Sequence, residues 1–276
     1  MWESESRRQA SRRIGTAPLR QAHPGENDLG DLDGSSVCAV PGARAGDGAA
    51  WMGAPMITLS SGTPAYVARP AQGTRRALVL FPDIGGLRPL FFDMCDALAA
   101  ERGWAVAAIE LWPGQESLPV EARLERVGSL DDARFMADGL EAAAQLDVAP
   151  VAALGFCMGG MLALKAASLP QFDRVVSCYG MVRVPDGWRS PSMADAIDAV
   201  QAGGDAVARK VLTVTGTDDP YLPPRDVDDL EALGASVVRY DGAGHGFMHD
   251  PSRPGHRADD AHDAWERIYG WLDVER

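Results

Sequence analysis

The chain has 276 residues, 46% of them hydrophobic, and a formal net charge of −13. Nucleic-acid phosphates and anionic membrane surfaces repel so acidic a protein, and we expect neither as a partner. The four cysteines have no CxxC or metal-ligand spacing, and no apolar run is long enough to span a membrane. We therefore expect a cytoplasmic protein, a monomer or small homo-oligomer, without a metal site or a disulfide framework.

The N-terminal region differs in composition from the rest of the chain. Residues 1–55 are rich in Gly, Ser, Ala, Arg and Asp and lack sustained apolar periodicity, which is typical of disorder. We expect a disordered tail or a mis-called start there, followed by one domain over residues 56–276 that can bury a large core. This domain opens with a pattern over residues 57–69 that predicts an edge hairpin.

Apolar strand-like runs then alternate with helical patterns. The runs predict strands at 77–81, 104–109, from 151 to the glycine-rich turn at 155, and at 174–180, 211–215 and 236–240. The helical patterns cover 91–101, 117–127, 130–146, the stretch after 158, 227–233 and 257–273. Residues 181–208 read as irregular, with at most one short helix, and could cap a site. This alternation predicts an α/β protein with a mostly parallel sheet and helices on both faces.

The stretch from Val151 to Leu164 carries the most specific motif. Its apolar run breaks at Gly-Phe-Cys-Met-Gly-Gly, residues 155–160, which is typical of the α/β-hydrolase nucleophile elbow Gly-x-Ser-x-Gly with Cys157 in place of serine. A nucleophile on so sharp a turn needs glycine two residues away on each side, and the following helix N-terminus favours a thiolate. The alternative is that Cys157 is a buried structural thiol.

A base and a carboxylate follow the elbow in the order that α/β-hydrolases use. Asp219 comes after the strand at 211–215, and His245 comes after the strand at 236–240, between two glycines. Because both lie in loops just past buried strands, we expect them to meet Cys157 at the carboxyl edge of the sheet. Asp218 competes with Asp219, which keeps the spacing to Gly216. The sequence thus predicts a Cys-His-Asp triad.

The oxyanion formed during ester cleavage needs two N–H donors. In this fold one donor is the backbone N–H after the nucleophile, here Met158, and the other comes from the loop after an early strand, here Ile84. Gly85 and Gly86 follow Ile84 and allow close backbone approach, or simply a tight turn.

These motifs resemble the dienelactone hydrolase (carboxymethylenebutenolidase) family. The match comprises residues 155–160, Asp219 and the Gly-His-Gly-Phe around His245, and it extends over about residues 75 to 273. The resemblance implies one α/β-hydrolase domain, no cofactor, and a triad that cleaves a lactone or another activated ester. It also implies that an acidic residue of the early loop contacts the resting thiol. Asp83 stands at that place.

The chain departs from the family at the positions that hold a substrate carboxylate. Family members acting on dienelactone carry one arginine in the loop after the strand that ends here at Leu111, and another four residues after the histidine. Here the first loop has none before Gln115, and His249 takes the second position; Arg88 is a candidate substitute. A broad carboxylesterase or thioesterase therefore stays open, as does a non-catalytic thiol sensor or ligand-binding module with Cys178 as a candidate resolving thiol.

Overall fold

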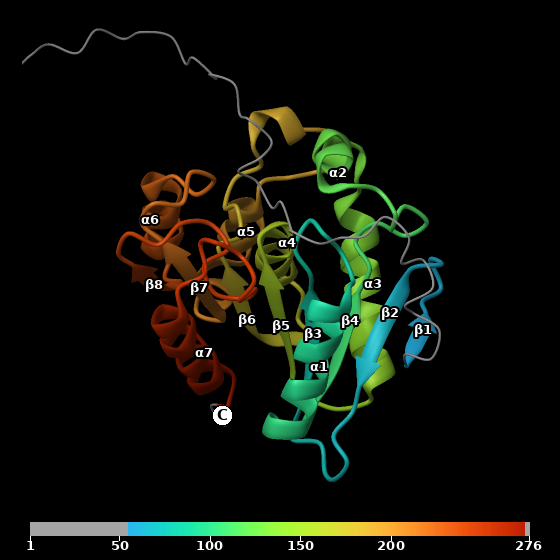
Figure 1. The fold of residues 1–276 in the computed structure, drawn as a ribbon. Coiled ribbons are helices and arrows are strands. Elements are labelled where there is room, and N and C mark those ends of the chain that lie inside the picture. The colour runs from blue at the N-terminus through green and yellow to red at the C-terminus, as the bar shows by residue number, and fades with distance from the viewer. Residues whose placement is uncertain (1–54, 274–276) are drawn as a thin grey trace, which may run out of the picture.

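The computed structural model describes residues 55–273, in which eight strands form one sheet in the order β1-β2-β4-β3-β5-β6-β7-β8 (Figure 1). The strands are β1 (Met56–Thr58), β2 (Pro64–Ala68), β3 (Arg76–Phe81), β4 (Trp104–Ile109), β5 (Val151–Phe156), β6 (Phe172–Cys178), β7 (Val211–Gly216) and β8 (Ser236–Tyr240). β1 and β2 form the predicted antiparallel hairpin at one edge, and β2 pairs antiparallel with β4. All pairs from β4 to β8 are parallel.

Helices cover both faces of the sheet, as the alternating pattern predicts (Figure 1). α1 (Pro89–Arg102) and α7 (Ala258–Leu272) pack on one face, and α3 (Asp132–Leu146), α4 (Met158–Ala166) and α5 (Ala196–Ala208) pack on the other. The remaining elements are α2 (Val120–Arg126), α6 (Pro224–Ala232) and the single 3₁₀ turns η1 (Val127–Ser129) and η2 (Asp186–Trp188).

The central strands are apolar because both of their faces are covered. Every residue of β3, β4 and β7 is buried. The buried guanidinium of Arg76 is the charged exception in β3, and its Nη1 pairs with Asp173 Oδ1 at 2.7 Å. Such a sheet brings the carboxyl ends of its strands to one edge, and the loops after β3, β5, β6, β7 and β8 all begin there.

Residues 181–208 contain more helix than the pattern predicts, since α5 covers 13 residues in two helical segments that meet at a kink at Gly204. Its buried face includes Ile197 and Val200, and it packs against α4. The sequence pattern fades because the helix contains Gly203 and Gly204, and Gly204 has a φ of 59° that interrupts the helical backbone. The two segments of α5 therefore depend on contact with α4 more than on local propensity.

The predicted tail, residues 1–55, lies outside the described residues except for Pro55. Within residues 55–273, no helix has both the length and the apolar character that a membrane crossing requires.

Candidate active site

Cys157 lies at a sharp turn between β5 and α4. Its φ of 54° and ψ of −119° are outside the regions that most side chains adopt, and such strain costs about 1–3 kcal/mol. Crowding of the backbone explains the glycines around it: a Cβ at Gly155 would lie 2.0 Å from the Gly159 carbonyl oxygen, and a Cβ at Gly159 would lie 2.0 Å from that of Phe81. The elbow therefore packs directly on the end of β3.

The first turn of α4 begins directly after Cys157. Met158 is the first residue of this helix, so its N–H has no partner within the helix and is available to an oxyanion. Cys157 itself is 7% exposed, which leaves its thiol accessible from one side only.

The structure places Asp219 against His245. The Nδ1 of His245 lies 2.8 Å from Oδ2 of Asp219, and the other carboxylate oxygen accepts the backbone N–H of Tyr221 at 2.9 Å. Asp218, the competing carboxylate, is exposed. Since a carboxylate accepts and does not donate, Nδ1 carries the proton and leaves Nε2 free to accept one.

Two tyrosines hold the His245 ring by edge contacts. The rings of Tyr179 and Tyr221 lie 5.2 Å and 5.0 Å from that of His245, with interplanar angles of 67° and 72°. These aromatic neighbours restrict the imidazole plane, while Asp219 fixes the tautomer; a general base would require both.

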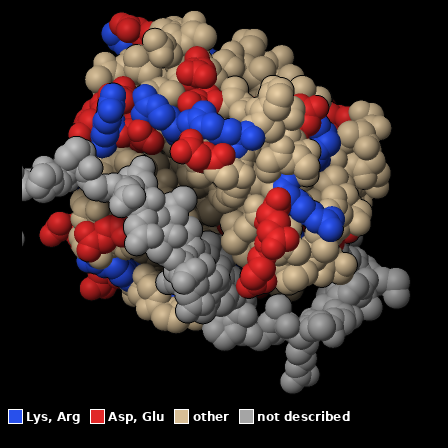
Figure 2. Space-filling model, turned by 90° about the horizontal axis from the view of Figure 1, so that it is seen from above, with Lys and Arg blue, Asp and Glu red and all other residues tan. Residues whose placement is uncertain are grey.

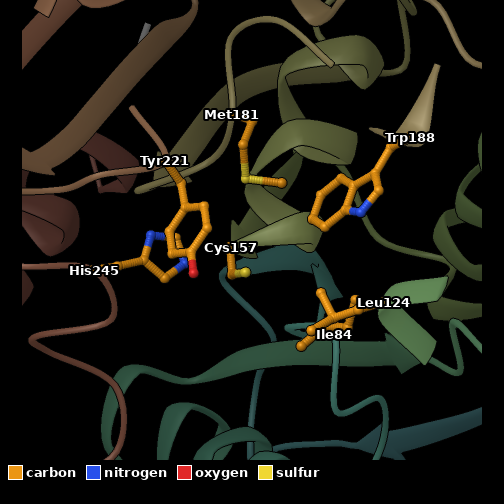
Figure 3. Close-up of a pocket in the computed structure, with 7 residues that line it drawn as sticks. All are labelled: Ile84, Leu124, Cys157, Met181, Trp188, Tyr221 and His245. Atoms are coloured by element: carbon orange, nitrogen blue, oxygen red, sulfur yellow. The ribbon is translucent and has the colours of Figure 1, made fainter. Parts of the chain in front are cut away.

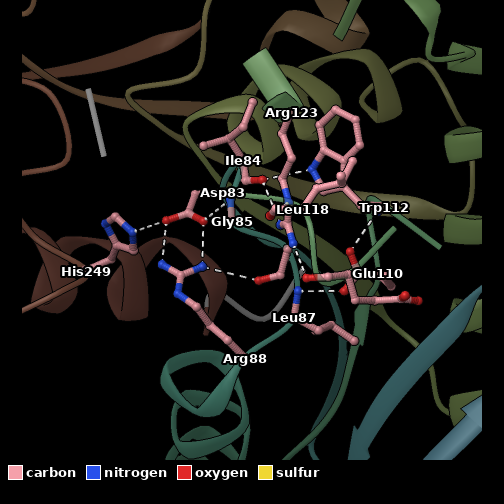
Figure 4. Close-up of polar contacts among 12 residues, drawn as sticks. Asp83, Ile84, Gly85, Leu87, Arg88, Glu110, Trp112, Leu118, Arg123 and His249 are labelled. Atoms are coloured by element: carbon pink, nitrogen blue, oxygen red, sulfur yellow. Dashed lines mark hydrogen bonds and ion pairs between the residues drawn. The ribbon is translucent and has the colours of Figure 1, made fainter. Parts of the chain in front are cut away.

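The loop after β3 presents Ile84 to the same site, and its backbone is held from several directions (Figure 4). The Asp83 carbonyl, in the same peptide group as the Ile84 N–H, accepts the Gly86 N–H at 2.9 Å. The Ile84 carbonyl accepts Trp112 Nε1–H at 2.8 Å and Arg123 Nη1–H at 3.2 Å. The direction of the Ile84 N–H is therefore set before any substrate binds.

A buried carboxylate supports this loop from below. Glu110 accepts the N–H groups of Leu87 at 2.9 Å and of Trp112 at 2.7 Å. Burial raises the pKa of Glu110, while these two N–H donors and Arg123 oppose the shift. Gly86 is required here because a Cβ would lie 2.4 Å from Glu110 Oε1. Sequence reasoning missed Glu110 and Arg123, which are far from any motif.

Asp83 and Arg88 lie together in a polar cluster beside the elbow (Figure 4). Arg88 donates to both oxygens of Asp83, at 2.6 Å and 2.7 Å, and His249 Nε2 lies 2.8 Å from Asp83 Oδ2. His249 Nδ1 in turn lies 2.5 Å from the Tyr179 hydroxyl. Arg88 thus serves as the partner of Asp83, and whether Asp83 also acts on the thiol stays a prediction.

The cluster has a definite protonation pattern. Burial alone raises the pKa of Asp83, but the Arg88 guanidinium and the hydrogen bonds to the carboxylate hold that pKa well below its usual range. Burial lowers the pKa of His249 despite the adjacent carboxylate. We therefore treat Asp83 as ionised and His249 as neutral, with Nε2–H donating to Asp83 and the Tyr179 hydroxyl donating to Nδ1.

Cys157, His245 and Ile84 line one pocket (Figure 3). Figure 3 shows the His245 ring on one side of Cys157, with Ile84 and the outer wall on the other. The rest of the lining comes from α2, η2 and the loops after β6 and β7, through Leu124, Trp188, Met181 and Tyr221. The pocket encloses about 280 Å³, its open mouth included. Within residues 55–273, no group of three or more His, Cys, Asp or Glu side chains could hold a metal ion.

The fold and the elbow define the class of protein. A strained residue between a central parallel strand and the helix that follows it, with Asp and then His in the loops after later strands, is the arrangement of an α/β-hydrolase.

Comparison with known proteins narrows the class to a family. The model of the "Dienelactone hydrolase family" matches residues 63–275. The carboxymethylenebutenolidase of Rhodococcus opacus is 30% identical over 212 residues, which are 71% of this chain and 79% of that protein. A Methylorubrum extorquens protein assigned as a carboxymethylenebutenolidase is 31% identical over 229 residues, 76% of each chain. The chain therefore belongs to the dienelactone hydrolase family and is a hydrolase.

Solved structures agree on the fold. The crystal structure of a Klebsiella pneumoniae protein assigned as a dienelactone hydrolase has a TM-score of 0.67 and 25% identity, over 77% of this chain and 93% of that one. A dienelactone hydrolase-like promiscuous phosphotriesterase from metagenomic libraries has a TM-score of 0.59 and 19% identity, over 77% of this chain and 92% of its own.

Proposed function

We propose that this protein hydrolyses a lactone or another small activated ester, with Cys157 as nucleophile, His245 as general base and acid, and Asp219 as the residue that orients His245. The observation that carries the proposal is the 2.8 Å contact between His245 Nδ1 and Asp219, because it turns Nε2 into a proton acceptor within the pocket that Cys157 lines. The names of the carboxymethylenebutenolidase relatives support a lactone as the substrate.

Acylation is the first half of the proposed cycle. His245 Nε2 takes the thiol proton, and the Cys157 sulfur attacks the carbonyl carbon, forming a C–S bond while the carbonyl oxygen becomes an oxyanion. The N–H groups of Ile84 and Met158 donate to that oxyanion. When the tetrahedral intermediate collapses, the C–O bond breaks and His245 gives its proton to the leaving alkoxide. A thioester on Cys157 and a free hydroxyl result.

Deacylation reverses these roles with water. His245 removes a proton from water as the water oxygen attacks the thioester carbon, and the same two N–H groups stabilise the second oxyanion. The C–S bond then breaks, the proton returns to the sulfur, and a carboxylic acid leaves. For a lactone the alkoxide and the acid are ends of one molecule, so hydrolysis gives a single hydroxy acid.

The test is hydrolysis of p-nitrophenyl acetate and of a lactone panel that includes dienelactone. Cys157→Ala should abolish turnover, and Cys95→Ala, which removes a buried thiol of α1, should leave it intact. Persistent hydrolysis by pure Cys157→Ala protein would contradict the role of Cys157. Cys95 and Cys178 are buried thiols that form no disulfide, which supports the cytoplasm as the location.

The thiol-sensor alternative needs a partner for Cys157. Cys178 lies in β6, paired in register with Phe156, so it is close in the fold. Its side chain is fully buried, however, and burial raises the pKa of its thiol. A resolving cysteine has to form a thiolate, so this arrangement favours hydrolysis. Ready alkylation of Cys157 without turnover of any ester would favour the sensor.

A further inference from the structure

We propose that the pocket selects uncharged esters or lactones with an apolar acyl group, and disfavours substrates that bring a carboxylate into it. This inference rests on the proposed function and names the substrate class of the same site. It predicts a selectivity opposite to that of an enzyme that anchors its substrate by a carboxylate.

The wall of the pocket opposite His245 is uncharged. Opposite His245, the lining side chains are Ile84, Leu124, Met181 and Trp188, none of which carries a charge (Figure 3). An ionised carboxylate placed among them would lose its water without gaining a partner, which strongly disfavours binding. An aliphatic or aromatic acyl group would instead bury apolar surface, which favours binding.

The arginines beside the pocket, Arg88 and Arg123, do not offer a site for a substrate carboxylate, because each already donates to acceptors of the protein (Figure 4). Arg88 uses both Nη groups on Asp83. Arg123 donates to three backbone carbonyls, those of Ile84, Glu116 and Leu118. Burial lowers the pKa of Arg123, and the nearby carboxylate of Glu110 opposes that shift. His249, which is neutral, has no exposed side-chain surface.

One further cation lies close to the catalytic loop. An Nη atom of Arg253 would lie 2.1 Å from a Cβ at Gly246, the residue after His245. Arg253 is not among the residues that line the pocket. If an anionic substrate were preferred, Arg253 would be the cation available to bind its carboxylate. The experiment therefore includes an Arg253 variant.

The outer face of the molecule around the site also offers balanced charge. In Figure 2, which looks onto this end of the molecule, Lys and Arg side chains lie beside Asp and Glu side chains. Arg189 on the η2 side pairs with Asp186 and Asp195 at 3.0 Å and 3.3 Å. Arg183 pairs with Asp226 and Asp229. A positive field that would draw in an anion is therefore weak.

The apolar wall is held in place before a substrate arrives. η2 carries Trp188, whose backbone N–H donates to the Pro185 carbonyl at 2.8 Å. η2 rests on η1, where a Cβ at Gly128 would lie 3.3 Å from the Trp188 carbonyl oxygen. Because η1 directly follows α2, this contact ties Trp188 to the helix that bears Leu124. The two side chains form one surface that meets the acyl group.

The experiment compares two p-nitrophenyl esters that differ only at the end of the acyl chain. The mono-adipate ends in a carboxylate, and the 6-methylheptanoate ends in an isopropyl group of similar shape. For the wild type we expect kcat/KM to be at least about 100-fold higher for the neutral ester, since the carboxylate finds no partner in the pocket. Equal values, or a preference for the adipate that Arg253→Gln removes, would overturn the proposal.

A positive charge introduced into the pocket wall tests the proposal from the opposite direction. Leu124→Arg should raise kcat/KM for the adipate, because the guanidinium supplies the missing partner. The ratio of kcat/KM for the neutral ester to kcat/KM for the adipate should fall by about 10-fold or more. Leu124 is only half-buried, so the substitution is compatible with folding. The matched control is Glu125→Gln, which changes the net charge equally at an exposed position of the same helix and should leave the ratio unchanged. An unchanged ratio in Leu124→Arg would contradict the proposal.

The outcomes separate this inference from the proposed function. Turnover that survives in Cys157→Ala contradicts the catalytic role alone. Binding of the corresponding adipoyl and 6-methylheptanoyl anilides to Cys157→Ala, measured by calorimetry, tests the selectivity without any chemical step. Tighter binding of the neutral anilide supports the inference, and equal or weaker binding overturns it, whether or not Cys157 is the nucleophile.

Discussion

A single carboxylate at Asp219 serves two partners, the His245 ring and the Tyr221 backbone. Asp219→Asn should therefore lower kcat by about 10³-fold or more, because the amide can stabilise the wrong tautomer of His245 and does not balance the imidazolium that forms. Steady-state kinetics on p-nitrophenyl acetate give the measurement.

The neighbouring carboxylate provides a control for that substitution. Asp218→Asn makes the same chemical change at an exposed side chain and should leave kcat within about two-fold, as surface substitutions usually do. If Asp218→Asn caused the larger loss, the assignment of the two carboxylates would be reversed.

Gly159 leaves no room for a side chain at the elbow. Its Cβ would fall 2.0 Å from the Phe81 carbonyl oxygen and 2.1 Å from that of Pro82, and both contacts are with backbone. Gly159→Ala should destabilise the protein by about 3 kcal/mol or more in urea denaturation, since neither β3 nor α4 can shift without moving the site.

Gly270 serves as the control, because alanine at this position is expected to stabilise the protein. Gly270 lies in α7, is exposed, and has no atom within 4 Å of its would-be Cβ. Gly270→Ala should raise the free energy of unfolding by about 0.5–1 kcal/mol, because alanine has the higher helix propensity. A loss of stability there would mean that the crowding argument does not separate these two positions.

Among the elements, the loop after β6 supports the site through Tyr179. This residue has a φ of 41°, is fully buried, and places its hydroxyl against His249. Tyr179→Phe leaves the His249 Nδ1 buried without a donor, and we expect a loss of about 1–3 kcal/mol in the free energy of unfolding.

The comparison for Tyr179 is a tyrosine whose partner has access to water. The Tyr66 hydroxyl contacts the exposed carboxylate of Asp96 at 2.9 Å. Tyr66→Phe should cost less, about 0.5–1 kcal/mol, because water can replace the lost contact. Equal losses in the two variants would show that the His249 acceptor is not isolated from solvent.

Elements that have a local sequence pattern could be predicted from the sequence alone. β3, β4 and β7 are continuous apolar runs, and the Gly-x-Cys-x-Gly-Gly turn encodes the strained backbone of Cys157 directly, so both could be predicted. The cluster of Asp83, Arg88 and His249 could not, because its members come from two loops that only the folded sheet brings together. The extent of α5 was missed because Gly203 and Gly204 weaken the helical pattern around its kink, and contact with α4 is not visible in the sequence.

At the scale of the whole molecule, the buried His249 makes stability depend on pH. Burial lowers the pKa of His249 in the folded state below the unfolded value of about 6.5, so the unfolded chain binds more protons in that window. Stability should therefore be complete above about pH 6.5 and fall on acidification, by at most about 1.4 kcal/mol per pH unit from this group. The groups that face His249 are Asp83, Tyr179, Arg88 and Arg253.

A variant isolates this contribution. His249→Gln retains a donor for Asp83 and has no titration near neutrality, so its free energy of unfolding should change less than that of the wild type between pH 7.5 and 5. Asp83, whose pKa is depressed, contributes stability that is lost only below about pH 4. Identical slopes for wild type and His249→Gln in urea denaturation would contradict a neutral His249.

In the proposed function, different parts of this molecule carry out the reaction and select the substrate. Cys157, Asp219, His245 and Ile84 follow the ends of sheet strands, whereas Leu124 and Trp188 belong to α2 and η2, which join those strands without entering the sheet. Residues in such connections can vary with little effect on the core. New acyl specificities should thus be obtainable by exchanging these two connections, with the reaction itself carried over unchanged.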